Sequence, residues 1–242
     1  MKVLGIETAT AVCATAIVDG ENILSESILD SPRMHSEKLM EMINDCLLNA
    51  RLELALLDGI AVSIGPGSFT GLRIGLSVAK GLSYSAGIPL VSVSTLKAIA
   101  WHAVYSNIVC PSDLILPLID ARRDDVYTSL YKWDGNNLEE ILPPITLSLK
   151  EIANRIPQQN RIIVLGDNAE KYLKVICHDE NYNFSDYINA SNEFHSYNAR
   201  TVAMLGMRNL NSDLTEDIAA IEPLYMKDFY ILVKSQHQKA IT

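Results

Sequence analysis

Gly65-Pro66-Gly67-Ser68-Phe69-Thr70-Gly71-Leu72-Arg73-Ile74-Gly75 separates the apolar run Ile60 to Ile64 from a helix-like stretch that reaches about Ala86. A buried strand, a turn and a helix in this order are typical of an α/β domain. Backbone N–H groups at the start of a helix favour anions, so a phosphate-binding loop is the first hypothesis to test.

Two phosphate-loop patterns fail on this stretch. A P-loop needs Gly-Lys-Ser/Thr after its first glycine and four residues, but the first lysine after this turn is Lys80. A dinucleotide-binding turn needs G-x-G-x-x-G, whereas the gap between Gly67 and Gly71 is one residue too long and Pro66 lacks an N–H.

The same stretch carries a row of small residues at helical spacing. Gly71, Gly75, Ala79 and Ser83 recur every fourth residue and therefore share one face of the expected helix. A row of small side chains lets another element approach closely. That element is either this chain's own sheet and neighbouring helix or the surface of a partner, and the pattern leaves both open.

The composition predicts a folded protein. Its 242 residues, 48% hydrophobic and 20% charged, fit one large domain or two smaller ones. A net charge of -9 argues against autonomous binding to nucleic acid, which needs a basic surface. With neither a membrane-length apolar run nor a signal peptide, we expect a cytoplasmic location without membrane contact. The cysteines, Cys13, Cys46, Cys110 and Cys177, form no C-x-x-C pair and are expected to be buried free thiols.

The order of predicted elements occurs twice along the chain. In the first half, strands at 3–6, 12–18 and 23–28 precede a helix at about 39–50, the strand 59–64, the helix to about 86, the strand 90–93 and a helix to about 103. The second half has strands at 114–119, 126–131 and 138–142, a helix at 148–156 with a Ser148–Glu151 capping box, the strand 161–165 and a further helix; a last helix follows at about 199–209. We therefore predict a duplicated α/β fold of the actin, sugar kinase and Hsp70 type, with lobes at 1–104 and 105–242. The last helix and tail could pack back on the first lobe.

Catalytic, cofactor and metal sites are not predicted. The turns after the first strand of each half, Glu7 to Ala11 and Asp120 to Asp125, lack the glycines that would let a backbone approach a phosphate, so we expect no strong nucleotide binding by the chain alone. Glu7 and Asp120 are expected to be hydrogen-bond acceptors that close turns, although a general base or metal ligand stays open. No helix presents paired histidines among His35, His102, His178, His195 and His237, and G-x-S-x-G is absent. His35, next to Ser36, is expected to make a local contact.

Several motifs together resemble the TsaB (YeaZ) family. They are Ile6 to Thr10, Met34 to Glu37, Gly65 to Gly75, Ala79 to Leu82, Asp120 to Arg122 with Val126-Tyr127, and Pro223 to Met226. The resemblance runs nearly from end to end, and the long glycine motif is the most specific part. One departure is Glu7, where the family often has Asp, which leaves open any role of that acid.

The resemblance implies a non-catalytic subunit in the formation of N6-threonylcarbamoyladenosine on tRNA, next to the anticodon. It implies pairing with the transferase TsaD through helices of the first lobe, an ATPase called TsaE in the same complex, and self-association through the same surface. It also implies indirect contact with tRNA and a nucleotide only in the complex. The alternative is a stand-alone nucleotide-binding or hydrolase (glycoprotease-like) enzyme. The expected interface residues are Met34, His35, Leu39, Met42, Gly71, Leu72, Gly75, Ala79 and Ser83.

Overall fold

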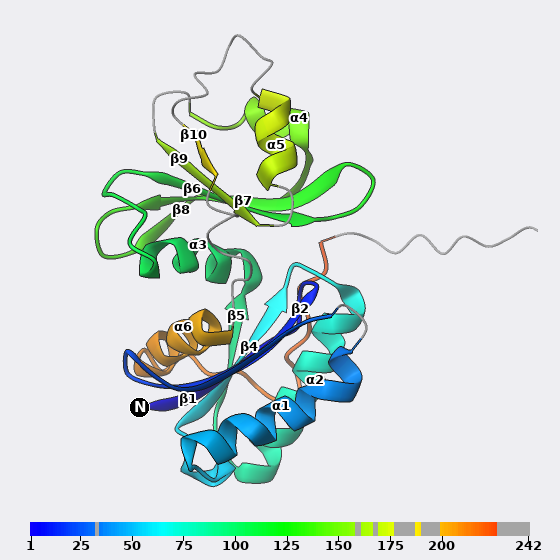
Figure 1. Cartoon of the computed structure of the whole chain (residues 1–242), viewed down its shortest axis with the longest axis vertical. Helices are drawn as coiled ribbons and strands as arrows, with labels where there is room; N and C mark the ends of the chain where they lie inside the picture. The colour runs from blue at the N-terminus through cyan, green and yellow to red at the C-terminus, as the bar shows by residue number, and fades with distance from the viewer. Residues whose placement is uncertain (32–33, 158–160, 167–168, 177–186, 190–198, 227–242) are drawn as a thin grey trace, which may run out of the picture.

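The computed structural model describes residues 1–31, 34–157, 161–166, 169–176, 187–189 and 199–226. Its strands form two five-stranded sheets with the orders β3-β2-β1-β4-β5 and β10-β9-β6-β7-β8. The two sheets lie one above the other in Figure 1, with helices between them and on their outer faces.

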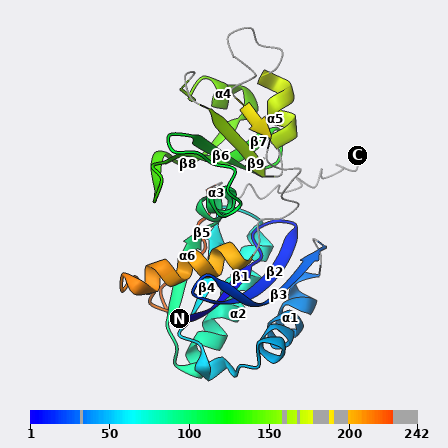
Figure 2. The ribbon, with the colours of Figure 1, turned by 60° about the vertical axis from the view of Figure 1, so that its left-hand side comes forward.

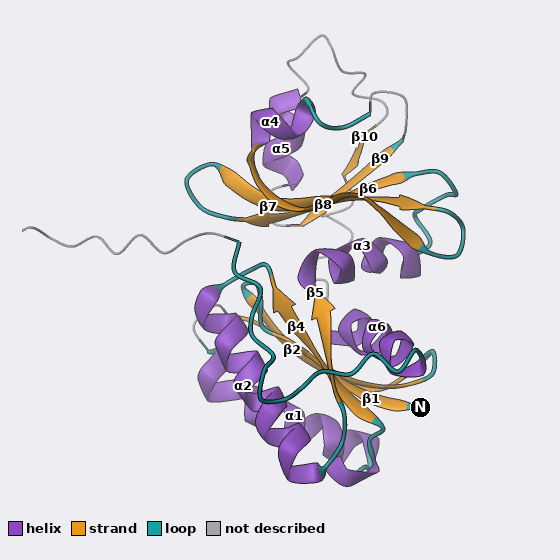
Figure 3. Ribbon diagram, turned by 180° about the vertical axis from the view of Figure 1, so that it is seen from behind, coloured by secondary structure: helices purple, strands orange, loops and turns teal. Residues whose placement is uncertain are grey.

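The first sheet begins with an antiparallel meander and ends with two parallel strands. Its strands are β1 (Lys2–Glu7), β2 (Val12–Asp19), β3 (Asn22–Asp30), β4 (Gly59–Gly65) and β5 (Leu90–Ser94). The helices α1 (His35–Ala50) and α2 (Phe69–Ala86) cover one face, and α6 (Ala199–Asn211) covers the other (Figures 1 and 3). The short 3₁₀ helix η1 (Leu54–Leu56) connects α1 to β4. Because both faces are covered, β1, β2 and β4 are apolar along almost their whole length.

The second sheet repeats this plan. Its strands are β6 (Leu114–Asp120), β7 (Asp125–Trp133), β8 (Leu138–Ser148), β9 (Ile162–Gly166) and β10 (Tyr187–Asn189), and β9 is parallel to both β6 and β10. The helices α4 (Leu149–Ala153) and α5 (Ala169–Ile176) pack on its outer face, and α3 (Thr95–Tyr105) packs on its inner face (Figure 2). The strand order and the strand directions match those of the first sheet, so the predicted duplication is confirmed.

The last helix of each repeat packs mainly on the sheet of the other repeat. The helix α3 follows β5 but lies chiefly against β6, whereas α6 follows β10 and lies chiefly against β1 and β4. Both helices contribute to one hydrophobic cluster that joins the two sheets and contains Val3, Ile99, Trp101, Ile115 and Val202. The predicted boundary between residues 104 and 105 falls at the end of α3 and remains a proposal. By their contacts, α6 and residues 212–226 lie with the first sheet.

Several details differ from the prediction. The strand β10 and η1 were not expected, and α4 ends at Ala153 because the backbone continues as a tighter turn, with Arg155 N–H donating to Ile152 O. The capping box of Ser148 and Glu151 is present as predicted. Cys13 and Cys46 are buried free thiols, but the expectation is wrong for Cys110, which is exposed, and Cys177 lies outside the described residues.

Candidate docking site at the glycine-rich turn

The glycine-rich turn lies against the turn that follows β1. Ser68 N–H donates to the Ala9 carbonyl at 2.6 Å, and Thr8 Oγ1 donates to the Gly71 carbonyl at 2.8 Å. The side chain of Ser68 also caps α2 by accepting a hydrogen bond from Gly71 N–H at 3.2 Å. The N–H groups of Ser68 and Gly71 therefore already have partners within the chain.

The glycines of this turn allow the two segments to approach closely. A Cβ atom at residue 71 would stand 2.0 Å from Thr8 O, and one at residue 75 would stand 2.2 Å from Thr8 Oγ1. At Gly67 the distance to Ala9 O would be 2.3 Å. Any side chain at these positions would displace the first turn. Gly71 and Gly75 of the row of small residues thus pack on the chain's own first turn, and backbone of that turn fills the space beside them.

The acids that end β1 and β6 hold equivalent turns. Glu7 is fully buried, its Oε1 accepts from Ala9 N–H at 2.5 Å, and its Oε2 accepts from the Ser63 hydroxyl. Asp120 Oδ1 accepts from Arg122 N–H at 2.9 Å. Each carboxylate therefore accepts the N–H two residues further along, as expected for an acid that closes a turn. In the second turn the three residues 122–124 all have left-handed backbone angles, with φ of 63°, 58° and 65°.

A second family motif packs on the same turn. We call residues 222–226 the strap. Leu224 N–H donates to the Ile64 carbonyl at 2.7 Å, which attaches the strap to the end of β4. The Tyr225 ring lies 5.0 Å from the Phe69 ring, and its hydroxyl accepts from Arg73 Nε at 2.8 Å. The Arg73 guanidinium also lies 3.8 Å above Phe69. The glycine motif and the Pro223-Leu224-Tyr225-Met226 motif are therefore one structural unit, which the sequence did not reveal.

The residues predicted as interface contacts point inward, with one exception. The inward-facing residues are His35, Leu39 and Met42 on α1 and Gly71, Leu72, Gly75, Ala79 and Ser83 on α2, and all of them are buried in the monomer. Met34, just before α1, is half-buried. The side chains of the buried residues lie inside the monomer, so that their part in contact with a partner stays a prediction.

The outward surfaces of α1 and α2 carry different residues. Leu48 on α1 is 66% exposed and Tyr84 on α2 is 81% exposed, with Met40 at 51%. Ser77, Gly81 and Ser85 are exposed at four-residue spacing on α2, so a row of small residues faces away from the sheet as well. We call Met40, Leu48, Ser77, Gly81, Tyr84 and Ser85 the outer helical face. In the sequence, this face could have been recognised from apolar or small residues at helix positions outside the core-facing side of α1 and α2.

The histidines give no sign of a metal site in the described part of the chain. His35 Nε2 lies 3.2 Å from Val12 O, so its contact is with the start of β2 and not with Ser36. Burial and the nearby Arg200 lower the pKa of His102 to about 4. His178, His195 and His237 lie outside the described residues. Within the described ranges no cluster of His, Cys, Asp or Glu is arranged to hold a metal, and no helix is long and apolar enough to cross a membrane.

Comparison with solved structures identifies the fold. The chain superposes on YeaZ from Pseudomonas aeruginosa with a TM-score of 0.75, covering 93% of this chain and 100% of that one at 22% identity. It also superposes on the ethanolamine utilization protein EutJ from Carboxydothermus hydrogenoformans with a TM-score of 0.52, covering 85% and 90% of the two chains at 10% identity. The predicted duplicated actin-like fold is confirmed.

Comparison of sequences identifies the family. A family model described as TsaD, tRNA N6-adenosine threonylcarbamoyltransferase, matches residues 22–234. The tRNA threonylcarbamoyladenosine biosynthesis protein TsaB of Bacillus subtilis is 30% identical over 177 residues, which are 73% of this chain and 75% of that protein. TsaB of Escherichia coli is 35% identical over 150 residues, which are 60% and 63% of the two chains. Relatives of this name, together with the shared fold, establish that the chain belongs to the TsaB (YeaZ) family.

Proposed function

We propose that the chain is a non-catalytic docking subunit in the cytoplasmic formation of N6-threonylcarbamoyladenosine next to the anticodon of tRNA. Its partners are a TsaD-like transferase and a TsaE-like ATPase. The names of its curated relatives support the role in this modification, and the net charge of -9 favours contact with tRNA through other subunits.

The outer helical face carries the proposal. A glycine in a helix interior costs roughly 0.5–1 kcal/mol relative to alanine, and the buried glycines of α2 offset this cost by close packing. Close packing within the monomer does not explain Gly81, since a Cβ atom there would meet nothing within 4 Å. With Ser77 and Ser85 it forms an exposed row of small residues beside Tyr84. This combination suits the close approach of a partner helix.

The residues first expected at the interface lie on the opposite, core-facing sides of the helices that carry the outer helical face. Leu72, Ala79 and Leu39 are at most 1% exposed, and Ala79 and Leu39 belong to the cluster between the first sheet and its two outer helices. Their part in docking is to fix how α1 and α2 lie relative to the sheet. Substitutions at these positions would weaken pairing with the transferase by destabilising the monomer.

The filled first turn supports a subunit that binds no nucleotide by itself. Direct hydrogen bonds from Ser68 and Thr8 join the glycine-rich turn to the first turn. A nucleotide, where one takes part, belongs to the assembled complex. Calorimetric titration of the isolated chain with Mg-ATP tests this, and we expect no saturable heat at micromolar concentrations. Saturable heat would favour the alternative, a stand-alone nucleotide-binding or hydrolytic enzyme.

The docking role is tested with Gly81→Leu. The monomer has open space at this position, so its melting temperature should not fall, whereas co-purification with the transferase should decrease at least about tenfold because the leucine blocks helix approach. Lys150→Leu on α4 is the control for added apolar surface, since Lys150 is exposed on the other lobe. Equal pairing of Gly81→Leu and the wild-type chain would contradict the assignment of this face.

The modified nucleoside itself gives the cellular readout. In cells that depend on the variant, mass spectrometry of digested tRNA should show less threonylcarbamoyladenosine with Gly81→Leu than with Lys150→Leu. Self-association through the same face predicts that the transferase displaces a homodimer in sedimentation experiments. A homodimer that persists in excess transferase would show that self-association and transferase binding use different surfaces.

A further inference from the structure

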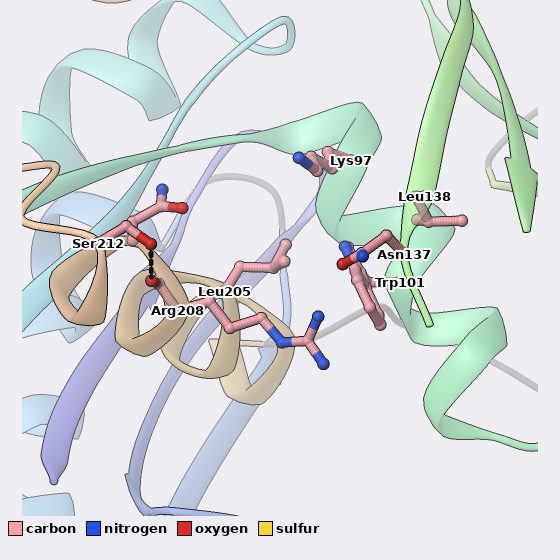
Figure 4. A pocket seen from close by; sticks show the side chains of 8 residues that line it. Lys97, Trp101, Asn137, Leu138, Leu205, Arg208 and Ser212 are labelled. Atoms are coloured by element: carbon pink, nitrogen blue, oxygen red, sulfur yellow. Dashed lines mark hydrogen bonds between the residues drawn. The ribbon is translucent and has the colours of Figure 1, made fainter. Parts of the chain in front are cut away.

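A small cleft lies between the two sheets, beside α3 and α6. It has a volume of about 150 Å³ and is lined by α3, α6, the turn between β7 and β8, and two leucines. Its polar lining consists of Lys97, Trp101, Asn137, Arg208, Asn209 and Ser212. Figure 4 shows Lys97, Trp101, Asn137 and Arg208 gathered around one space from three different elements.

The charge of this cleft is opposite to that of the whole chain. Lys97 and Arg208 are its charged residues and no carboxylate lines it, although the chain has a net charge of -9. Lys97 is exposed, and no ion pair joins it to a carboxylate in the described ranges. Two cations in a lining that contains no carboxylate make the local potential positive, which attracts an anion.

Trp101 supplies an unused hydrogen-bond donor at the same cleft. The residue is 3% exposed, and its indole Nε1 is buried without a hydrogen-bond partner among the described residues. Buried N–H groups are nearly always paired, and those that are not call for an explanation such as an absent ligand or water. Asn137 also lines the cleft, and its side-chain amide adds a further donor.

The size and the ring contacts limit what can bind. Pockets for drug-sized ligands have volumes of roughly 300–1,000 Å³, so this cleft is too small for a whole nucleotide. The Trp101 ring is also not free for stacking on a base. The Arg208 guanidinium lies 4.1 Å above it, and Trp133 packs against it in a T-shaped contact at 5.5 Å. A small polyatomic anion fits both limits, because its oxygens accept hydrogen bonds and it needs no ring face.

We propose that this cleft binds a small oxyanion, a phosphate or carboxylate group, through Lys97, Arg208 and the indole N–H of Trp101. Arg208 is held by its stacking on Trp101 and by a hydrogen bond with the Tyr105 hydroxyl, and its planar guanidinium has further N–H donors for the anion. The site contains residues of α3, α6 and the second lobe, so an anion would also join the two lobes. The cleft is separate from the outer helical face, and the proposal does not depend on the proposed function.

Tryptophan fluorescence tests the proposal directly. The chain has two tryptophans, Trp101 in the cleft and Trp133 packed against it, and Trp133→Phe leaves Trp101 as the only tryptophan for selective excitation. We expect a saturable change in emission on titration with inorganic phosphate or with acetate, at an ionic strength held constant with sodium chloride. Saturation with phosphate alone would identify a phosphate site, and saturation with acetate alone would identify a carboxylate site.

The same titration is repeated on matched variants. Lys97→Ala removes an exposed side chain and should weaken binding at least about tenfold, the effect of one charge-assisted hydrogen bond. Lys150→Ala removes the same charge from α4 and should bind as the wild type does. Melting temperature with each anion against sodium chloride gives a second readout on the unmodified chain. Absence of a saturable response in both readouts, or equal binding by Lys97→Ala, would overturn the proposal.

Discussion

Gly71 lies so close to Thr8 that a Cβ atom at residue 71 would stand 2.0 Å from the Thr8 carbonyl oxygen. The Thr8 hydroxyl in turn donates a 2.8 Å hydrogen bond to the Gly71 carbonyl. This pair fixes the start of α2 on the turn after β1. A glycine-rich turn between a strand and a helix therefore serves here to pack one backbone against another.

Substitutions at two glycines of α2 should have opposite effects on stability. Gly75→Ala places a methyl group 2.2 Å from Thr8 Oγ1 and should lower the free energy of unfolding by about 1–3 kcal/mol through overpacking. Gly81→Ala has open space and should raise it by roughly 0.5–1 kcal/mol, since alanine favours the helix. Urea denaturation of both variants measures the difference. Equal free energies of unfolding would show that the turn after β1 moves to accommodate the methyl group of Gly75→Ala without destabilising the fold.

Tyr225 should control how firmly the strap is attached. Tyr225→Phe removes the hydrogen bond from Arg73 but keeps the ring beside Phe69, whereas Tyr225→Ala removes both contacts. We expect a loss of about 0.5–1.5 kcal/mol for the hydrogen bond and a further loss for the ring contact. Hydrogen exchange of the Leu224 amide, which is bonded to Ile64 O, should accelerate most in Tyr225→Ala. Unchanged exchange in both variants would mean that the backbone bond alone holds the strap.

His102 should make stability depend on pH in a defined window. Its pKa falls from 6.5 to about 4 in the folded chain, because burial and Arg200 disfavour the charged imidazole. Between these values the unfolded chain binds more protons, so the free energy of unfolding should decrease as the pH falls from 6.5 to about 4, by at most about 3 kcal/mol. His102→Gln should flatten this part of a curve of stability against pH, measured by urea denaturation. A slope that stays the same in the variant would assign the effect to other groups.

The thiols of Cys110 and Cys13 should differ strongly in reactivity. Cys110 is exposed, whereas Cys13 is fully buried and burial, together with Glu7, raises its pKa to about 11. The thiolate is the reactive form, so at pH 8 iodoacetamide should modify Cys110 first. Peptide mapping by mass spectrometry follows each site separately. Early modification of Cys13 would indicate that the first sheet opens on the timescale of the reaction.

The repeated fold could be predicted because periodicity is a local property. Each half of the sequence carries its own strand and helix signals, and local capping signals such as Ser148 with Glu151 mark where helices begin. The position of Glu7 and Asp120 at strand ends also indicated turns closed by carboxylates, and the hydrogen bonds of both acids agree with this. The strand β10 could not be predicted, since a three-residue strand carries too little pattern.

The candidate site was harder to predict because helical spacing shows which residues share a face but not where that face points. The row from Gly71 to Ser83 was compatible with a partner or with the chain's own sheet and neighbouring helix. In the structure all four residues are buried, and Gly71 and Gly75 lie against Thr8. The contact between Arg73 and Tyr225 spans 152 positions of sequence, so no local pattern could reveal it. The cleft around Trp101 likewise combines α3, α6 and the turn between β7 and β8.

The sequence by itself thus determined the order of the elements, the duplication and the family, because these depend on local periodicity and on motifs that are continuous along the chain. Only the tertiary structure decided that α3 and α6 each pack chiefly on the other repeat's sheet, and that Gly75 faces inward while Gly81 faces outward. The physical reason is that burial depends on which surfaces meet, and those surfaces come from segments far apart in the sequence.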